Sequence, residues 1–169
     1  DAGSLDEGDL KFAQDRLRIL SGLYGLLRPL DAIEPYRLEM GSKLEIEEVS
    51  SLYKYWGSAL AKKLNDEAKE IQSNTIVNCA SQEYFNAVDL KALELDVVTP
   101  VFLEHKDGKA KMISFFAKKA RGMLARFAIK NRVTDPSQLL DFDYGGYKFS
   151  PDDSDHSKLV FTRPYPSSK

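Results

Sequence analysis

The stretch "PVFLEHKDGKAKMISFFAKKARGMLARFAIKNR", residues 100–132, decides the fold, because it predicts a strand, a tight turn and a long helix in succession. Residues 96–105 form a largely apolar strand, and Asp107-Gly108 is typical of a two-residue hairpin turn. Residues 109–116 are predicted to form the returning strand. A helix follows at 116–131. The apolar residues that fall on one side of it at helical spacing are Phe116, Ala120, Met123, Leu124 and Phe127.

The same stretch is strongly basic. Residues 108–132 contain eight Lys and Arg and no Asp or Glu, so the other 144 residues of this chain, whose net charge is −2, carry about −10. The cations of the helix that lie away from its apolar side are Lys118, Lys119, Arg121, Arg126 and Lys130. They repel one another, and the helix has no acid for i,i+4 pairs. The pattern predicts a face that binds an anion such as phosphate, with an ordinary solvated face or a membrane-surface helix as alternatives.

The remaining segments mix helices and strands. One helix is predicted at 9–20, with Asp9 as N-cap and Gly22 at its end, and another at 50–71, with Gly57 inside an amphipathic pattern. The other predicted elements are a buried strand at 75–81, a short helix at 81–88, a helical turn at 135–140, and strands at 146–150 and 158–163. This mixture predicts an α+β fold, with a mixed sheet, hairpins and amphipathic helices in a single compact domain over residues 1–169.

The composition argues against several classes of protein. Cys79 is the only cysteine, so no internal disulfide can form, and its place in an apolar strand indicates a buried residue rather than a nucleophile. His105 and His156 are far apart, and neither a metal-ligand spacing nor a glycine-rich nucleotide motif is present. No apolar run reaches the length of a membrane span. We therefore expect no metal, no cofactor and no membrane contact.

The segment "SGLYGLLRPLDAIEPYRLEMG" (21–41) predicts a long ordered loop or several short turns. Gly22 and Gly25 could expose backbone N–H groups to a phosphate, as in the hairpin of helix-hairpin-helix DNA-binding proteins. That hairpin usually has one residue between its glycines, whereas this sequence has two, and a helix C-cap followed by a turn is an equal interpretation. Arg28 and Arg37 suit a bound oxyanion, or an Arg–Glu pair that fixes the loop.

Polar side chains also gather in "NCASQEYF" (78–85), where the buried strand ends. Ligands of open α/β sheets bind at such ends, helped by the N-terminus of the following helix. Asn78, Ser81, Glu83 and Tyr84 are therefore candidate catalytic residues, with Glu83 as general acid or base. The alternative is structural, with Ser81 as a plain N-cap, because the pattern of a capping box is missing.

Several segments together resemble the YaaA family of peroxide stress proteins. The block "LRILSGLYGLLRPLDAIEPYRLEMG" (17–41) is similar to the family's signature. The segments that follow in the family's order are "YKYWG" (53–57), "NCASQEYF" (78–85), "PVFLEHKDGKAKMISFFAKKARGMLARF" (100–127) and "LVFTRP" (159–164). Family members also carry an N-terminal segment with a Ser-Pro-Ala-Lys motif, which this sequence lacks. We therefore expect the chain to be the C-terminal part of a YaaA-like protein.

The resemblance implies a cytoplasmic bacterial protein that protects against hydrogen peroxide by limiting free iron and its damage to DNA. It also implies a compact α/β fold with a positively charged cleft, a helix-hairpin-helix-like element and DNA binding. The positions that match are Gly22 to Gly25 for the hairpin, and Lys118, Lys119, Arg121 and Arg126 for the basic wall.

We expect a DNA-binding stress protein rather than an enzyme, with mainly backbone contacts to DNA. The alternative is an enzyme acting on a small nucleoside-like or phosphorylated substrate, in which Arg37 and Lys118 hold the anion beside Glu83. A further alternative is an interaction protein whose basic face meets an acidic partner.

Overall fold

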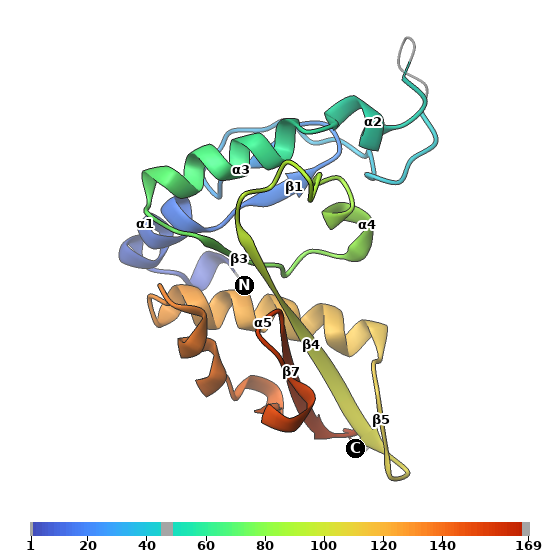
Figure 1. The fold of residues 1–169 in the computed structure, drawn as a ribbon. Coiled ribbons are helices and arrows are strands. Elements are labelled where there is room, and N and C mark those ends of the chain that lie inside the picture. The colour runs from blue at the N-terminus through green and yellow to red at the C-terminus, as the bar shows by residue number, and fades with distance from the viewer. Residues whose placement is uncertain (1, 45–48, 167–169) are drawn as a thin grey trace. The chain divides into compact units, whose positions relative to one another are not determined.

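The computed structural model describes residues 2–44 and 49–166. By its internal contacts the chain divides into two compact units. The first unit comprises Asp1–Asn74 and Ala80–Leu95, and the second comprises Thr75–Cys79 and Asp96–Lys169. Helices and a mixed sheet are both present, so the predicted α+β class is confirmed (Figure 1).

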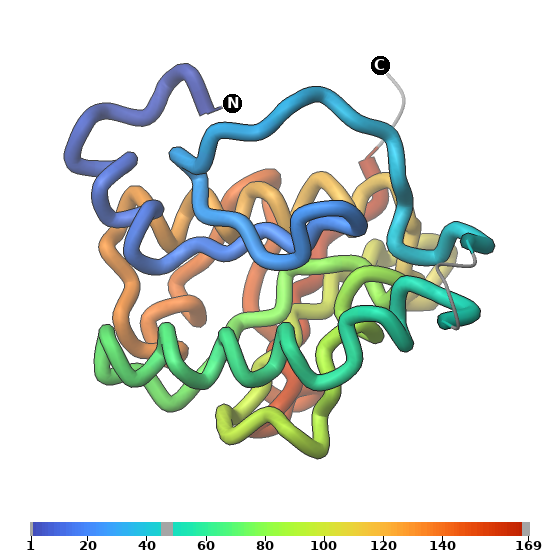
Figure 2. Tube along the Cα trace, turned by 90° about the horizontal axis from the view of Figure 1, so that it is seen from above, coloured from blue at the N-terminus to red at the C-terminus, as the bar shows by residue number. Residues whose placement is uncertain are grey.

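Helices and one β-hairpin form the first unit (Figure 1). Its elements are η1 (Ala2–Ser4), α1 (Glu7–Arg16), β1 (Ile19–Ser21), β2 (Gly25–Leu27), α2 (Leu52–Trp56), α3 (Ala59–Glu70) and α4 (Gln82–Phe85). Of the stretch 21–41 that the sequence predicts to be loop or turns, Ser21 and residues 25–27 belong to the hairpin strands. Residues 28–44 contain turns but neither helix nor strand, and Figure 2 follows this connection from β2 toward α2. The buried core of the unit consists of Met40, Leu52, Leu60 and Ala87.

Helix α1 begins and ends earlier than the sequence predicts. Its N-cap is Asp6, whose carboxylate accepts the backbone N–H of Asp9 at 2.8 Å, while the Asp9 carboxylate accepts the N–H of Asp6 at 3.2 Å. The predicted cap, Asp9, is therefore the third residue of the helix. The predicted end near Gly22 is also wrong, because the chain leaves the helix after Arg16 and residues 19–21 pair with 25–27.

The single helix predicted at 50–71 is two helices. Helix α2 ends at Trp56, Gly57 has a φ of +48°, and α3 begins at Ala59. This backbone angle favours glycine over residues with a side chain, so the glycine marks the break. The indole N–H of Trp56 donates to the carbonyl of Gly22 at 3.2 Å, which joins α2 to the hairpin.

A buried carboxylate on α3 forms ion pairs with three cations of the first unit. Glu67 accepts a hydrogen bond from Arg18 Nε and lies 3.3 Å from Arg28 Nη2 and 3.1 Å from Lys63 Nζ. Burial by itself raises the pKa of Glu67, but the hydrogen bonds from Arg18 and Lys63 and the charges of Arg18 and Arg28 outweigh it, so the pKa falls below its ordinary value. The ionised carboxylate therefore ties the hairpin region to α3.

A five-stranded mixed sheet and one long helix form the second unit (Figure 1). Its elements are β3 (Thr75–Val77), β4 (Asp96–Lys106), β5 (Lys109–Lys111), α5 (Ser114–Lys130), η2 (Pro136–Asp141), η3 (Tyr144–Gly146), β6 (Lys148–Phe149), η4 (Pro151–Asp153) and β7 (Lys158–Pro164). The strand order is β3-β4-β7-β6, with β5 paired to β4. Strand β4 is parallel to β3 and β7 and antiparallel to β5, and β6 is antiparallel to β7.

The predicted strand–turn–strand–helix order of the second unit is confirmed, with one change of boundary. Strand β5 ends at Lys111, and α5 already begins at Ser114, so the helix takes residues 114–116 from the predicted strand. The turn has Asp107 and Gly108 at φ +53° and +73°, as a hairpin turn with two positive φ angles requires.

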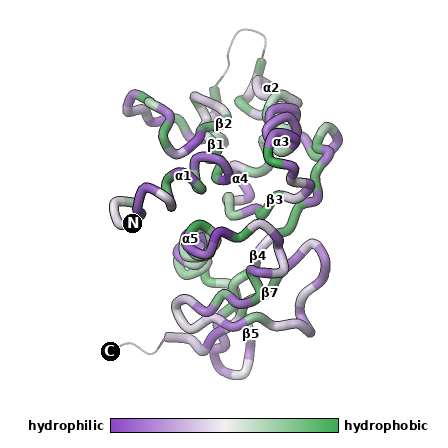
Figure 3. Tube along the Cα trace, turned by 90° about the vertical axis from the view of Figure 1, so that its left-hand side faces the viewer, coloured by the Kyte–Doolittle hydropathy of each residue, from purple (hydrophilic) through white to green (hydrophobic). Residues whose placement is uncertain are grey.

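The core of the second unit lies between α5 and the sheet. Helix α5 buries Ala117, Ala120, Leu124 and Phe127, and Figure 3 shows both hydrophobic and hydrophilic residues around the helix. The four rings that fill the space beneath it are Phe102, Phe142, Tyr147 and Phe161, and the centroid of Phe102 is 5.0 to 5.9 Å from the other three. The apolar side predicted for this helix is therefore the buried side.

Replacing Glu67 by Gln is expected to lower the free energy of unfolding by about 3 kcal/mol, because it leaves the guanidinium of Arg18 without its charge partner. The pKa of Glu67 is lowered in the folded state, so its stabilisation is present above pH 4.5 and is lost as the pH falls through that lowered pKa. Urea unfolding followed by circular dichroism at neutral and acidic pH measures both effects.

The matched control is Glu70→Gln, since the exposed carboxylate of Glu70 also contacts Arg28, at 3.6 Å. This control should lose at most about 1 kcal/mol, as exposed ion pairs do. Equal losses in the two variants would contradict a special role for the buried carboxylate.

Candidate nucleic-acid interface

The exposed side of α5 carries two adjacent, accessible lysines. The side chains of Lys118 and Lys119 are exposed, and neither forms an ion pair with any residue in the described parts of the chain. Their neighbours Ala117 and Ala120 are buried in the core. The lysines are therefore held on a rigid element and directed away from the core.

The surface next to these lysines is open. Gly122 lies one turn after Lys118, is exposed, and has no neighbouring atom within 4 Å of the position that a Cβ would take. A glycine inside a helix costs about 1 kcal/mol relative to alanine. Neither a positive φ nor close packing requires a glycine at this position. The bare backbone leaves room for a large ligand to approach the helix closely.

The other predicted cations of α5 differ in accessibility. Arg121 and Arg126 are half-buried, and Lys130 is exposed at the last residue of the helix. Arg121 lies close enough to Cys79 for its charge to act on the thiol. The lysines are thus better placed than the arginines to meet a ligand from solvent.

Gly22 and Gly25 have a structural reason to be glycines. Both are buried, Gly22 in the turn between β1 and β2 and Gly25 as the first residue of β2. A Cβ on Gly22 would lie 2.5 Å from the carbonyl oxygen of Leu38, and one on Gly25, whose φ is +75°, would lie 2.6 Å from the Trp56 ring. The elements on both sides of the turn are strands, so the predicted helix-hairpin-helix-like element is not formed at these glycines. A helix C-cap is wrong too, since α1 ends at Arg16.

The two arginines of the predicted anion-binding loop have different surroundings. Arg28 lies 3.3 Å from Glu67 and 3.6 Å from Glu70, so for this residue the alternative of an Arg–Glu pair is the one observed. Arg37 is exposed and forms no ion pair with the residues that the structure describes. Of the two, Arg37 alone has a guanidinium without a carboxylate partner in the described chain.

Three of the four candidate catalytic residues lie at α4 in the first unit. Ser81 Oγ accepts the backbone N–H of Tyr84 at 3.4 Å, which is the predicted N-cap contact. Glu83 Oε1 accepts the backbone N–H of Gly41 at 2.9 Å, and the Tyr84 hydroxyl donates to Glu39 Oε2 at 2.8 Å. Ser81 and Glu83 therefore hold backbone groups in place, and the remaining side-chain pair is Tyr84 with Glu39.

Tyr84 keeps its proton at neutral pH. Burial, followed by the hydrogen bond and charge of Glu39, raises the pKa of Tyr84 to about 12. The hydroxyl is therefore a hydrogen-bond donor rather than a base. The fourth candidate, Asn78, belongs to the second unit, where its backbone N–H donates to the carbonyl of Val98 at 2.8 Å.

Metal clusters and membrane spans are absent from residues 2–44 and 49–166. No group of three or more His, Cys, Asp or Glu within these ranges is placed to hold a metal ion. No helix within them combines the length and the apolar content needed to cross a bilayer.

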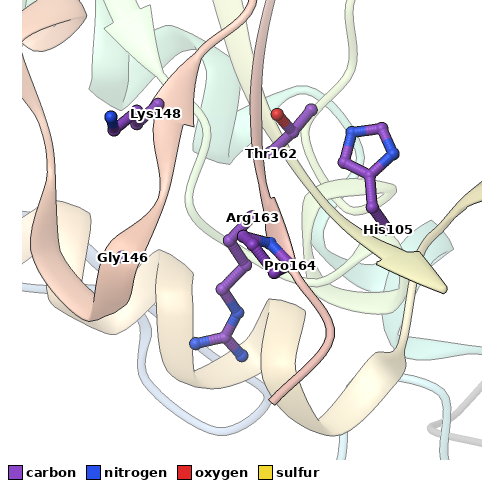
Figure 4. A pocket seen from close by; sticks show the side chains of 6 residues that line it. All are labelled: His105, Gly146, Lys148, Thr162, Arg163 and Pro164. Carbon is purple, nitrogen blue, oxygen red and sulfur yellow. The ribbon is translucent and has the colours of Figure 1, made fainter. Parts of the chain in front are cut away.

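A hollow in the second unit was not predicted from the sequence (Figure 4). Its open space of about 620 Å³ is lined by His105, Gly146, Lys148, Thr162, Arg163 and Pro164. The sheet register brings them together, because His105 pairs with Pro164 and Lys148 pairs with Thr162. Figure 4 shows the guanidinium of Arg163 directed away from Thr162. These residues come from β4, η3, β6 and β7, so no local sequence pattern could have identified them as one group.

The guanidinium of Arg163 pairs with a buried carboxylate, that of Glu104. Glu104 is fully buried, and its Oε1 accepts hydrogen bonds from the Tyr147 hydroxyl and, at 3.3 Å, from Arg163 Nε. Arg163 Nη1 donates to the carbonyl of Gly145 at 2.9 Å. Burial and Glu104 raise the pKa of Tyr147, so its hydroxyl remains a donor. The network fixes the end of β7 beside β4.

The Cys79 thiol is expected to react slowly at neutral pH. It packs against the core of the second unit, and burial raises its pKa to about 11, although the charge of Arg121 acts in the opposite direction. Because the thiolate is the reactive form, the rate of alkylation by iodoacetamide should rise up to about pH 11. Glutathione, measured alongside, controls for the reagent. A rate that levels off below pH 9 would contradict a buried thiol.

Comparison with known proteins identifies a family. The family model described as "Peroxide stress protein YaaA" matches residues 1–153. The chain is 59% identical over 170 residues to a UPF0246 protein of Roseobacter denitrificans, covering 99% of this chain and 66% of the relative. The chain is 58% identical over 165 residues to a UPF0246 protein of Ruegeria pomeroyi, covering 98% of this chain and 64% of the relative. It is 60% identical over 163 residues to a UPF0246 protein of a Jannaschia species, covering 96% of this chain and 63% of the relative.

The chain spans slightly less than two thirds of the length of these curated relatives. The family match extends over most of the chain, and the identity to these relatives is high throughout. The chain therefore belongs to the peroxide stress protein YaaA family, as its sequence resemblance predicts.

Proposed function

We propose that this chain binds DNA through the sugar-phosphate backbone, with the exposed side of α5 as its contact surface. The observation that carries the proposal is the adjacent pair Lys118 and Lys119, exposed on a rigid helix and without ion pairs to the described residues. Phosphate is the common anion for such a face. Arg37 offers a further exposed cation on the first unit.

Lysine contacts of this kind recognise charge rather than base sequence. The ammonium group is a point charge on a flexible stem, and contacts to phosphates carry no direct sequence information. Gly122 supports the same interpretation, because its open surface lets a backbone come close to the helix without a side chain in the way. The expected binding is therefore similar for different DNA sequences and steeply dependent on salt.

We further propose that the protein works in the bacterial cytoplasm in the response to hydrogen peroxide and limits iron-dependent damage to DNA by covering it. Membership of the YaaA family supports the stress role. Nicking of a supercoiled plasmid by ferrous iron and peroxide tests the proposal. Wild-type protein should reduce nicking, and a variant with α5 lysines reversed should protect less. Equal protection by the wild type and the variant would show that the α5 lysines are not needed for protection.

A second candidate is an enzyme acting on a small nucleoside-like or phosphorylated substrate. The observation that favours it is the exposed contact between the Tyr84 hydroxyl and Glu39, at 2.8 Å. The variant Tyr84→Phe removes this hydrogen bond, and Glu39→Gln removes the negative charge that accepts it, each with little change in volume. If either variant abolished protection against peroxide while DNA affinity stayed the same, the enzyme would be favoured.

The double reversal Lys118→Glu/Lys119→Glu is expected to weaken duplex binding at least tenfold at low salt, equally for two unrelated sequences. Each lost phosphate contact should also reduce the slope of log K against log salt by about one, from the roughly −4 to −5 expected for four to six contacts. Fluorescence anisotropy with labelled duplexes over a series of NaCl concentrations measures both quantities.

The matched control is Lys11→Glu/Lys62→Glu, which makes the same change in net charge at two exposed helical lysines of the first unit. It should leave the affinity within about threefold of wild type, because it changes only the long-range field. If both double variants lost affinity equally, the binding would depend on net charge and not on α5.

Substitutions at Gly122 should separate stability from binding. Gly122→Ala is expected to raise the free energy of unfolding by about 1 kcal/mol, since the added methyl group meets open space in a helix. Gly122→Leu should also stabilise the helix but reduce DNA affinity severalfold, because its side chain stands where the DNA backbone approaches. Urea unfolding and anisotropy measure the two effects, and unchanged DNA affinity in Gly122→Leu would place the DNA elsewhere.

A further inference from the structure

We propose that the exposed ring of Phe115, three residues after the exposed Met112, stacks against unpaired bases of DNA whose phosphates are held by neighbouring lysines. This inference rests on the proposed DNA binding and adds to it a second kind of contact, made only with DNA that contains unpaired nucleotides. It also assigns a role to apolar residues that phosphate binding alone does not use.

Two large apolar side chains are exposed together where β5 leads into α5. Phe115 is 72% exposed and Met112 is 59% exposed, the first value being the highest among the large hydrophobic residues that the structure describes. They lie three residues apart in the chain, at the start of the most basic segment. Single exposed apolar residues are ordinary, but two of them close in the chain and flanked by lysines suit a partner that is both apolar and anionic.

The Phe115 ring is the first of three aromatic rings that contact one another in a row. Its centroid is 5.8 Å from that of Phe116, which is 5.9 Å from that of Tyr165, both in edge-to-face geometry. The guanidinium of Arg163 lies 4.8 Å from the Phe116 centroid. The backbone N–H of Tyr165 donates to the backbone carbonyl of His105 at 3.0 Å. The row thus connects the exposed ring of Phe115 to the ends of β4 and β7.

Exposed lysines precede and follow this ring in the chain. Lys118 and Lys119 follow Phe115 at i+3 and i+4, the two spacings that place side chains next to each other on a helix. Lys109 and Lys111 of β5 precede it, and both are exposed. None of the four forms an ion pair within the part of the chain that the structure describes. An apolar protein partner would leave these charges unpaired, whereas a nucleic acid supplies both phosphates and ring faces.

The accessible face of the ring points to unpaired rather than paired bases. In a duplex the faces of the bases are covered by their neighbours in the stack, so an aromatic side chain has no face to contact. An unpaired base presents its face, and stacking on an aromatic ring together with cations along the backbone is how single strands are bound without sequence preference. Alanine substitution of such a ring weakens binding by about 5- to 100-fold.

The test compares three labelled probes of equal length by fluorescence anisotropy: oligo(dT), a duplex, and a single strand of abasic sites that has phosphates but no bases. We expect Phe115→Ala to weaken oligo(dT) binding by about 5- to 100-fold while changing the affinity for the duplex and the abasic strand less than about twofold. Phe115→Trp should restore oligo(dT) affinity, and its added indole fluorescence should be quenched by oligo(dT) but not by the abasic strand.

The matched control is Leu90→Ala, an apolar residue of the first unit that is 63% exposed, which should leave all three affinities unchanged. Equal loss on oligo(dT), duplex and abasic strand in Phe115→Ala would overturn the stacking role while leaving DNA binding intact. A wild-type protein that binds none of the probes would overturn the proposed function itself. A change of mass in light scattering on Phe115→Ala, with oligo(dT) affinity unchanged, would show that the ring contacts a second copy of the chain instead.

Discussion

The apolar side of α5 has to lie against the sheet, and this requirement determines where the cations of the helix are placed. Burying a leucine or phenylalanine stabilises the fold by about 1.5–3 kcal/mol, and Leu124 and Phe127 are both buried in this interface. Two exposed lysine charges in water repel by at most about 1 kcal/mol at close range, and salt reduces this further. Packing therefore outweighs repulsion, and the folded unit can hold Lys118 and Lys119 side by side without a carboxylate partner among residues 2–44 and 49–166.

Each of the two units contains a buried glutamate whose carboxylate has a cationic partner. In the first unit the buried Glu67 is surrounded by Arg18, Arg28 and Lys63, and in the second the buried Glu104 is bonded to Arg163 and Tyr147. A charge removed from water needs such partners, whereas an exposed one keeps its hydration. This difference separates two groups of cations that look alike in the sequence. Arg28 and Arg163 form ion pairs with internal carboxylates, while Lys118 and Lys119 of α5 and Lys109 and Lys111 of β5 are exposed.

The parts of the fold that could be predicted from the sequence are those encoded locally. The 3.6-residue period of α5, the Asp107-Gly108 turn and the Ser81 cap are each contained within a few residues, and the structure has all three. Leu17 and Leu20 are at helical spacing, yet residues 19–21 form β1 because residues 25–27 pair with them. The glycines of that hairpin make room for Trp56 and Leu38. Local pattern cannot reveal such neighbours, and for the same reason the pairing of Arg28 with Glu67 and the exposure of Phe115 became visible only in three dimensions.

The helical geometry of α5 also relates the proposed phosphate and base contacts to each other. Side chains at i, i+3 and i+4 have Cβ atoms about 5–6 Å apart, so the ring of Phe115 and the ammonium groups of Lys118 and Lys119 are neighbours on one surface. Consecutive phosphates of a stacked strand are separated by about 3.4 Å along the helix axis, and by more when a base leaves the stack. A lysine stem can span the remaining distance, so a nucleotide whose base lies on Phe115 would have its own or the adjacent phosphate within reach of one of these lysines. The two contacts therefore reinforce each other only for an unpaired nucleotide, since in a duplex the lysines find phosphates but the ring finds no exposed base face.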